Sequence, residues 1–145
     1  PNLLPVGAVV FMMLMMLSKI LMSLSDLLWF VIPANEYIIL ILTNVLCIAT
    51  VALIARSISR SIWVQVNRGT LRTKSLVISY SVLLAVLFVV QYLVREFVNA
   101  AIFAQMKQIQ GFFFTKSFEN FMTYATPVFR FIEMAVLIFA LTKRR

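Results

Sequence analysis

The chain has 145 residues, of which 63% are hydrophobic, and its formal net charge is +8. Soluble domains contain about 45–50% apolar residues, and a soluble domain of this size keeps too much surface exposed to hide the excess. The composition therefore excludes an ordinary soluble domain and predicts an integral membrane protein. Because the chain has no His and a single Cys, Cys47, it also excludes a disulfide within the chain and a Cys/His zinc site.

Four long apolar segments follow one another and predict membrane-spanning helices at about 6–32, 37–66, 74–99 and 124–142. About 20 apolar residues, each rising about 1.5 Å, cross a hydrocarbon core about 30 Å thick. Helices are the expected form, because lipid cannot satisfy free backbone groups and these runs lack the alternation of barrel strands. The expected fold is an all-α, integral membrane bundle of four transmembrane helices, with residues 1–145 forming a single transmembrane domain.

The first predicted helix contains two charged residues, Lys19 and Asp26. It does not have the form of a signal peptide, since it lacks a basic n-region and is longer than a simple h-region. Lys19, Ser23 and Asp26 follow the i, i+4, i+7 spacing that places side chains on one helix face. The helix is also rich in Met, which we interpret as adaptable packing, because a copper relay needs Met at the membrane mouth with defined spacing.

The second predicted helix has Asn44 in its apolar part and leads into a basic connection. The sequence Asn67-Arg68-Gly69 predicts the turn that ends this helix, because Asn and Gly tolerate the left-handed conformation. The basic residues of the connection are Arg56, Arg60, Arg68, Arg72 and Lys74.

The charges of the connections predict the orientation in the membrane. Segment 56–74 carries basic residues and no acid, whereas the first connection, 26–36, carries two acids and no base. The positive-inside rule places both termini and the middle connection in the cytoplasm. The expected location is a bacterial inner (plasma) membrane. Because the basic residues flank apolar runs, we interpret them as topology signals and expect no nucleic-acid partner.

The third predicted helix has Gln91, Arg95 and Asn99 in one stripe, with Glu96 beside it. The segment that follows, about 100–123, is long for a connection in so small a protein. Its aromatic residues alternate with charged ones, which predicts an amphipathic segment on the outer membrane surface. It would serve either as a lipid-facing aromatic belt or as a lid or partner-docking surface. The aromatic residues concerned are Phe103, Phe112, Phe113, Phe114, Phe118 and Phe121.

The fourth predicted helix holds Arg130 and Glu133 within its apolar stretch. Glu133 lies ten residues before Lys143, which places it about 15 Å from the inner interface and so near the bilayer centre. Arg130 lies one turn nearer the outside, at a depth that Lys19 of the first helix shares.

A polar stripe recurs on each of the predicted helices, and charged residues in a membrane normally face the bundle interior or water. The candidate intramembrane polar site comprises Lys19, Asp26, Asn44, Gln91, Arg95, Glu96, Arg130 and Glu133. Three interpretations stay open. The stripe joins the helices structurally, or Glu133 is a proton-relay group, or Lys19 and Arg130 outweigh Glu133 and accept an anion or a lipid phosphate.

The residue types argue against catalysis and cofactors. The chain has no His to act as a base, no Gly-rich phosphate loop and no carboxylate cluster for a metal. We expect no enzyme activity, no cofactor and no metal. The leading hypothesis is a non-catalytic membrane subunit that binds and positions a partner, which is another membrane protein or a second copy. The alternatives are a small oligomeric transporter, channel or lipid-handling protein using Lys19, Arg130 and Glu133, and an immunity or sensor-type membrane domain. Membrane lipids are expected partners in every case.

Overall fold

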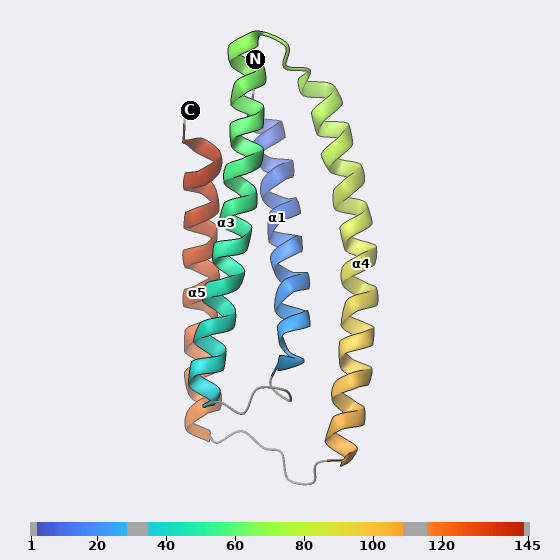
Figure 1. The fold of residues 1–145 in the computed structure, drawn as a ribbon, viewed down its shortest axis with the longest axis vertical. Coiled ribbons are helices and arrows are strands. Elements are labelled where there is room, and N and C mark those ends of the chain that lie inside the picture. The colour runs from blue at the N-terminus through green and yellow to red at the C-terminus, as the bar shows by residue number, and fades with distance from the viewer. Residues whose placement is uncertain (1–2, 29–34, 109–115, 144–145) are drawn as a thin grey trace.

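The computed structural model describes residues 3–28, 35–108 and 116–143. Within these residues the chain forms four helices, namely α1 (Leu4–Ser25), α3 (Glu36–Arg68), α4 (Thr73–Gln108) and α5 (Lys116–Thr142). The helices run along one common long axis (Figure 1). Each of them is long and apolar enough to cross a membrane. The predicted all-α fold with four apolar spanning-length helices is therefore confirmed.

Helix α1 is the common packing partner of the bundle. It packs most extensively against α4 and also contacts α3 and α5, while α3 and α5 pack against each other. The described residues of α4 and α5 share no extended contact, so α4 joins the bundle through α1. Helix α1 begins and α5 ends at the same end of the bundle as the connection between α3 and α4 (Figure 1).

The ends of α3 are fixed by local hydrogen bonds. At the start, the Asn35 side chain accepts a hydrogen bond from the backbone N–H of Tyr37 at 2.9 Å, which satisfies one of the free donors of the first turn. At the other end, Gly69 adopts a left-handed conformation with φ 69° and its N–H donates to the carbonyls of Gln65 and Val66. Glycine suits this position because it has no Cβ.

Two expected boundaries differ from the structure. Helix α1 ends at Ser25, not near residue 32, because the N–H groups of Asp26 and Leu27 donate to carbonyls only three residues back, at 3.3 and 3.2 Å. These bonds tighten the chain into turns and stop the helical ladder.

The second difference concerns the expected amphipathic segment at 100–123. Helix α4 continues to Gln108 and α5 already begins at Lys116. The described part of the segment is therefore the ends of two long helices and not a separate surface element. Helix hydrogen bonding is local to the backbone, so it continues through polar sequence beyond the apolar run. Phe112, Phe113 and Phe114 lie outside the described residues.

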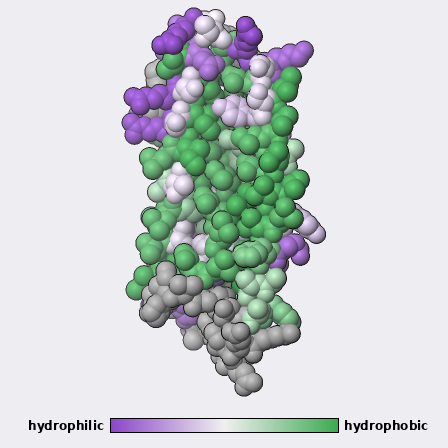
Figure 2. Space-filling view, turned by 45° about the vertical axis from the view of Figure 1, so that its right-hand side comes forward, coloured by the Kyte–Doolittle hydropathy of each residue, from purple (hydrophilic) through white to green (hydrophobic). Residues whose placement is uncertain are grey.

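The core lies where α1, α3 and α5 meet. Val10 and Leu14 of α1, Val51 and Ala55 of α3, and Leu137 of α5 are fully buried. Small side chains such as Ala55 allow the backbones of neighbouring helices to approach closely. The outside is apolar as well, since Figure 2 shows hydrophobic residues over most of the visible face and hydrophilic residues gathered at one end.

Candidate functional site

A buried polar network joins α1, α3 and α5 through the guanidinium of Arg130. From α5, Nη1 of Arg130 donates to Oγ of Ser18 at 3.1 Å and Nη2 donates to Oδ1 of Asn44 at 2.7 Å. Arg130 also forms an ion pair with Glu133 one turn along the same helix. Ser18, Asn44 and Glu133 are fully buried, whereas a quarter of the Arg130 side chain is exposed. A bulky cation is thus held by partners from three helices.

The network continues beyond the guanidinium into α3. Oγ of Ser18 lies 3.3 Å from Sγ of Cys47, and Nδ2 of Asn44 donates to the carbonyl of Leu40 at 2.8 Å. Oε1 of Glu133 meets no hydrogen-bond donor among the described residues. The buried carboxylate is therefore stabilised chiefly by its ion pair, which makes Glu133 and Arg130 depend on each other.

The predicted polar residues divide between this network and a second group. Asn44, Arg130 and Glu133 belong to the network. Lys19 does not: its side chain is exposed, and it lies at the edge of two hollows on the flank of α1. Lys19 and Arg130 thus border the same hollow but do not join in one hydrogen-bonded cluster.

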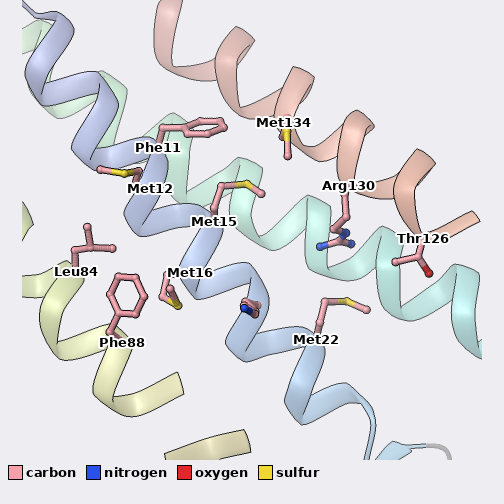
Figure 3. Close-up of a pocket in the computed structure, with 11 residues that line it drawn as sticks. Phe11, Met12, Met15, Met16, Met22, Leu84, Phe88, Thr126, Arg130 and Met134 are labelled. Atoms are coloured by element: carbon pink, nitrogen blue, oxygen red, sulfur yellow. The ribbon is translucent and has the colours of Figure 1, made fainter. Parts of the chain in front are cut away.

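The first hollow is an apolar cavity of about 580 Å³. It lies on the side of α1 where α4 and α5 diverge, and Figure 3 shows side chains of all three helices bordering the shared space. Its walls are Phe11, Met12, Met15, Met16, Lys19 and Met22 of α1, Leu84 and Phe88 of α4, and Thr126, Arg130 and Met134 of α5. The charged residues of the lining, Lys19 and Arg130, both lie toward its Met22 end.

The second hollow is a polar pocket of about 320 Å³ between α1 and α4. It is lined by Lys19, Ser23, Asp26, Gln91, Arg95, Val98 and Asn99. Lys19 borders both hollows, so the polar pocket adjoins the Met22 end of the apolar cavity. We refer to these two spaces below as the apolar cavity and the polar pocket.

Charges in the polar pocket are not paired with one another. No ion pair joins Asp26 to Lys19 or Arg95, although all three line the pocket. Asp26 as a whole residue is exposed, yet partial burial of its carboxyl raises its pKa above the ordinary value, because burial disfavours the charged form. The pocket thus presents two cations and one anion to whatever fills it.

Other predicted site residues lie elsewhere. Glu96 is exposed and lines neither hollow. Phe118 was expected on the membrane surface, but it is fully buried with its ring edge against Tyr37, 5.3 Å between centroids. Phe121 also contacts Tyr37, at 5.0 Å, while Phe103 is exposed on α4. Phe118 is buried because α5 packs against α3, so the first turns of α5 lie on the start of α3.

The basic connection lies at one end of the bundle. Arg56 and Arg60 belong to α3, Arg68 is the last residue of that helix, and Lys74 lies in the first turn of α4. All five predicted basic residues, with Arg72 between the helices, are exposed.

Comparison of the chain with protein-family models, with curated proteins and with solved structures finds no match. Function must therefore be inferred from the geometry of the network, the apolar cavity and the polar pocket.

Sequence reasoning missed Ser18 and the apolar cavity. We interpreted the methionines of the first helix as packing residues. Four of them line the cavity, at Met12, Met15, Met16 and Met22. A signal was present, because Met side chains at i, i+3, i+4 spacing lie on one helix face. Nothing in the sequence indicates that α5 fails to cover this face.

Proposed function

We propose that this protein binds a membrane lipid on its flank and holds an acyl chain in the apolar cavity between α4 and α5. The observation that carries the proposal is the combination of an apolar lining with a charged end. Of the eleven lining residues, eight are apolar, and the other three are Lys19, Thr126 and Arg130. A chain bound there would leave the polar group of its lipid at the charged end.

The length of the cavity fits one leaflet of a bilayer. Its α1 wall runs from Phe11 to Met22, a separation of 11 residues, or about 16 Å at a helical rise of about 1.5 Å. Half of a hydrocarbon core about 30 Å thick is about 15 Å. The cavity is thus matched to the chain of a lipid from the leaflet at the C-terminal end of α1.

The lining is suited to a flexible hydrocarbon. Met side chains have several rotatable bonds and a polarizable sulfur, so they adapt to irregular apolar shapes. Met12 and Phe88 are about half exposed, which supports access from the side of the bundle and not through a closed channel.

The charge at the end of the cavity supports an anionic group in the ligand. Arg130 is compensated by its ion pair with Glu133, but no ion pair of Lys19 is found with any described acid. A Lys within a spanning helix costs about 2.5–3.5 kcal/mol at the helix centre. A lipid phosphate beside Lys19 would offset part of that cost.

Native mass spectrometry of the protein released from lipid nanodiscs tests the proposal. Leu84→Trp fills the cavity from α4, and Leu83→Trp, on an exposed neighbouring position that lines no part of it, is the matched control. We expect retained lipid to fall about tenfold in Leu84→Trp, as a loss of about 1.4 kcal/mol gives, and to persist in Leu83→Trp. Equal retention in the two variants would show that the cavity is not the binding site.

A second candidate is the membrane subunit that positions a partner, and the exposure of α4 favours it. Among residues 73–104, Val98 is the only buried side chain, and Ile78, Val82 and Val89 are all more than half exposed. The partner would be another membrane protein with an apolar helix face. Stoichiometric co-purification of such a protein, lost in a Val82→Trp/Val89→Trp variant, would support this candidate.

We also propose that the end of the bundle with the basic connection lies in the cytoplasm of a bacterial cell, with both termini on that side. The support is the charge asymmetry, since Arg68, Arg72 and Lys74 lie at one end and Asp26 and Glu36 at the other.

A further inference from the structure

We propose that the polar pocket binds the head group of the lipid and selects a zwitterionic aminophosphate, of the phosphoethanolamine class. This inference rests on the proposed function, because it assigns the head group of the lipid whose chain fills the apolar cavity. It adds the chemistry by which one lipid is distinguished from another.

The first support is that the two spaces share a lining residue on α1. Lys19 lines both of them. Ser23 and Asp26 of the polar pocket follow Met22 of the apolar cavity directly along α1 and beyond its end. A single amphiphile that extends past Lys19 would occupy the two spaces in the order that a lipid requires, with its chain toward the membrane centre and its head group toward the end of α1.

The second support is the charge pattern. The polar pocket has two cations, Lys19 and Arg95, and one anion, Asp26, with no ion pair between them. A phosphate is recognised by ammonium and guanidinium donors, the latter in a planar fork. A primary ammonium on the same head group would compensate Asp26. Gln91 and Asn99 supply further amide donors and acceptors to the same space.

The same pattern discriminates against the other common head groups. A phosphoglycerol head group has the phosphate but no cation, so it leaves Asp26 uncompensated. A phosphocholine head group has a cation without N–H donors, so it cannot form a charge-assisted hydrogen bond with the Asp26 carboxylate. Discrimination therefore depends on Asp26, whereas affinity for any phosphate depends on Lys19 and Arg95.

Competition between lipids tests the inference. The protein is placed in nanodiscs of equal parts phosphatidylethanolamine, phosphatidylglycerol and phosphatidylcholine with identical oleoyl chains, and the retained lipids are counted by native mass spectrometry. We expect phosphatidylethanolamine to be enriched about tenfold over each competitor, the ratio that about 1.4 kcal/mol gives.

Two variants separate the roles. Asp26→Asn should abolish the enrichment over phosphatidylglycerol, while the control Glu119→Gln, an exposed acid in the first turn of α5 that lines neither hollow, should keep it. Lys19→Met should lower retention of all three lipids together.

The outcomes distinguish this inference from the proposed function. Retention of all three lipids in their bulk ratio by the wild-type protein would overturn the head-group assignment and leave the acyl-chain site in place. Retention of no lipid at all would overturn both. The wild-type competition decides the assignment even where Asp26→Asn does not fold. Unchanged enrichment in a folded Asp26→Asn protein would remove Asp26 from the selection.

Discussion

At Arg130, one side chain links three helices while being paired to a fully buried acid. Taking two charges out of water is costly, and their mutual attraction compensates only while both are present. Glu133 lines neither hollow and is fully buried. This placement favours the structural interpretation of the pair over a proton relay, because a relay needs a path from the carboxylate to water.

The first prediction concerns this pair. Glu133→Leu should lower the free energy of unfolding by about 3–5 kcal/mol, because it leaves the Arg130 charge uncompensated. The double variant Arg130→Met/Glu133→Leu should lose less than that single variant, since it removes both charges. Titration with SDS, followed by circular dichroism, measures the unfolding free energies of the wild type, of the single variants Glu133→Leu and Arg130→Met, and of the double variant. A double variant whose loss equals the sum of the two single losses would contradict the coupling.

At the residue scale, spacing within one helix indicated which side chains meet, whereas contacts between helices could not be predicted from the sequence. Arg130 and Glu133 are three residues apart on one helix, a spacing that lets opposite charges meet, and the structure has that ion pair. The partners Ser18 and Asn44 depend on how α1 and α3 are rotated and shifted against α5, which no single sequence encodes in a local pattern. Lys19 was grouped with Arg130 by depth, but depth does not specify which way a side chain faces.

At the scale of the helices, two glycines have opposite roles. Gly69 ends α3 with a positive φ, whereas Gly7 lies within α1 and has no such constraint. An added Cβ would meet open space at both positions. Differences between them therefore come from backbone conformation alone.

The second prediction uses this contrast. Gly69→Ala should destabilise the protein by about 1–2 kcal/mol, because the left-handed conformation brings Cβ against the following carbonyl. Gly7→Ala should stabilise it by about 0.5–1 kcal/mol, because Ala loses less freedom in a helix. Thermal unfolding in detergent, monitored at 222 nm, would measure both shifts. A stabilised Gly69→Ala variant would contradict the backbone argument at Gly69, and a destabilised Gly7→Ala variant would contradict the argument at Gly7.

Apolarity predicted the existence of the helices better than their ends. The apolar run of α4 stops near Val94, but the helix reaches Gln108, because its backbone bonds do not depend on a hydrophobic environment. The reverse holds for α1, whose apolar sequence runs on past Ser25 while hydrogen bonding changes at Asp26 and Leu27. Hydropathy reports where lipid is tolerated, and helix ends report where the hydrogen-bond ladder stops.

At the scale of the whole molecule, the orientation in the membrane can be measured by labelling introduced cysteines. Thr70, in the connection between α3 and α4, and Asn120, in the first turns of α5, are both exposed at opposite ends of the bundle. The native Cys47 is buried, so a cysteine introduced at either position is the accessible one.

The third prediction follows from the positive-inside rule. In intact cells, a membrane-impermeant maleimide should label Asn120→Cys and should label Thr70→Cys only after lysis. The wild-type protein, with Cys47 alone, measures the background. Labelling of Thr70→Cys in intact cells would reverse the proposed orientation and would move the polar pocket to the cytoplasmic side.

The architecture of the whole molecule was the part least accessible from the sequence. Four spanning segments define a bundle, but they do not say which helices are neighbours. The apolar cavity lies where α4 packs against α1 and diverges from α5, and the polar pocket lies between α1 and α4. Hydropathy does not distinguish one apolar helix from another. Which helices pack together depends on shape complementarity between side chains that are far apart in the chain.

The described residues of α4 pack extensively against α1 alone, so lipid binding in the apolar cavity would couple the stability of this protein to the composition of its membrane. A lipid chain seated beside α1 would bridge α4 and α5, which lack an extended contact of their own. A ligand that binds only the folded state adds RT ln(1 + [L]/Kd) to its stability, about 2.7 kcal/mol at a hundredfold excess over Kd. The bilayer would then act as both solvent and ligand reservoir, and melting temperature would follow the mole fraction of the preferred lipid.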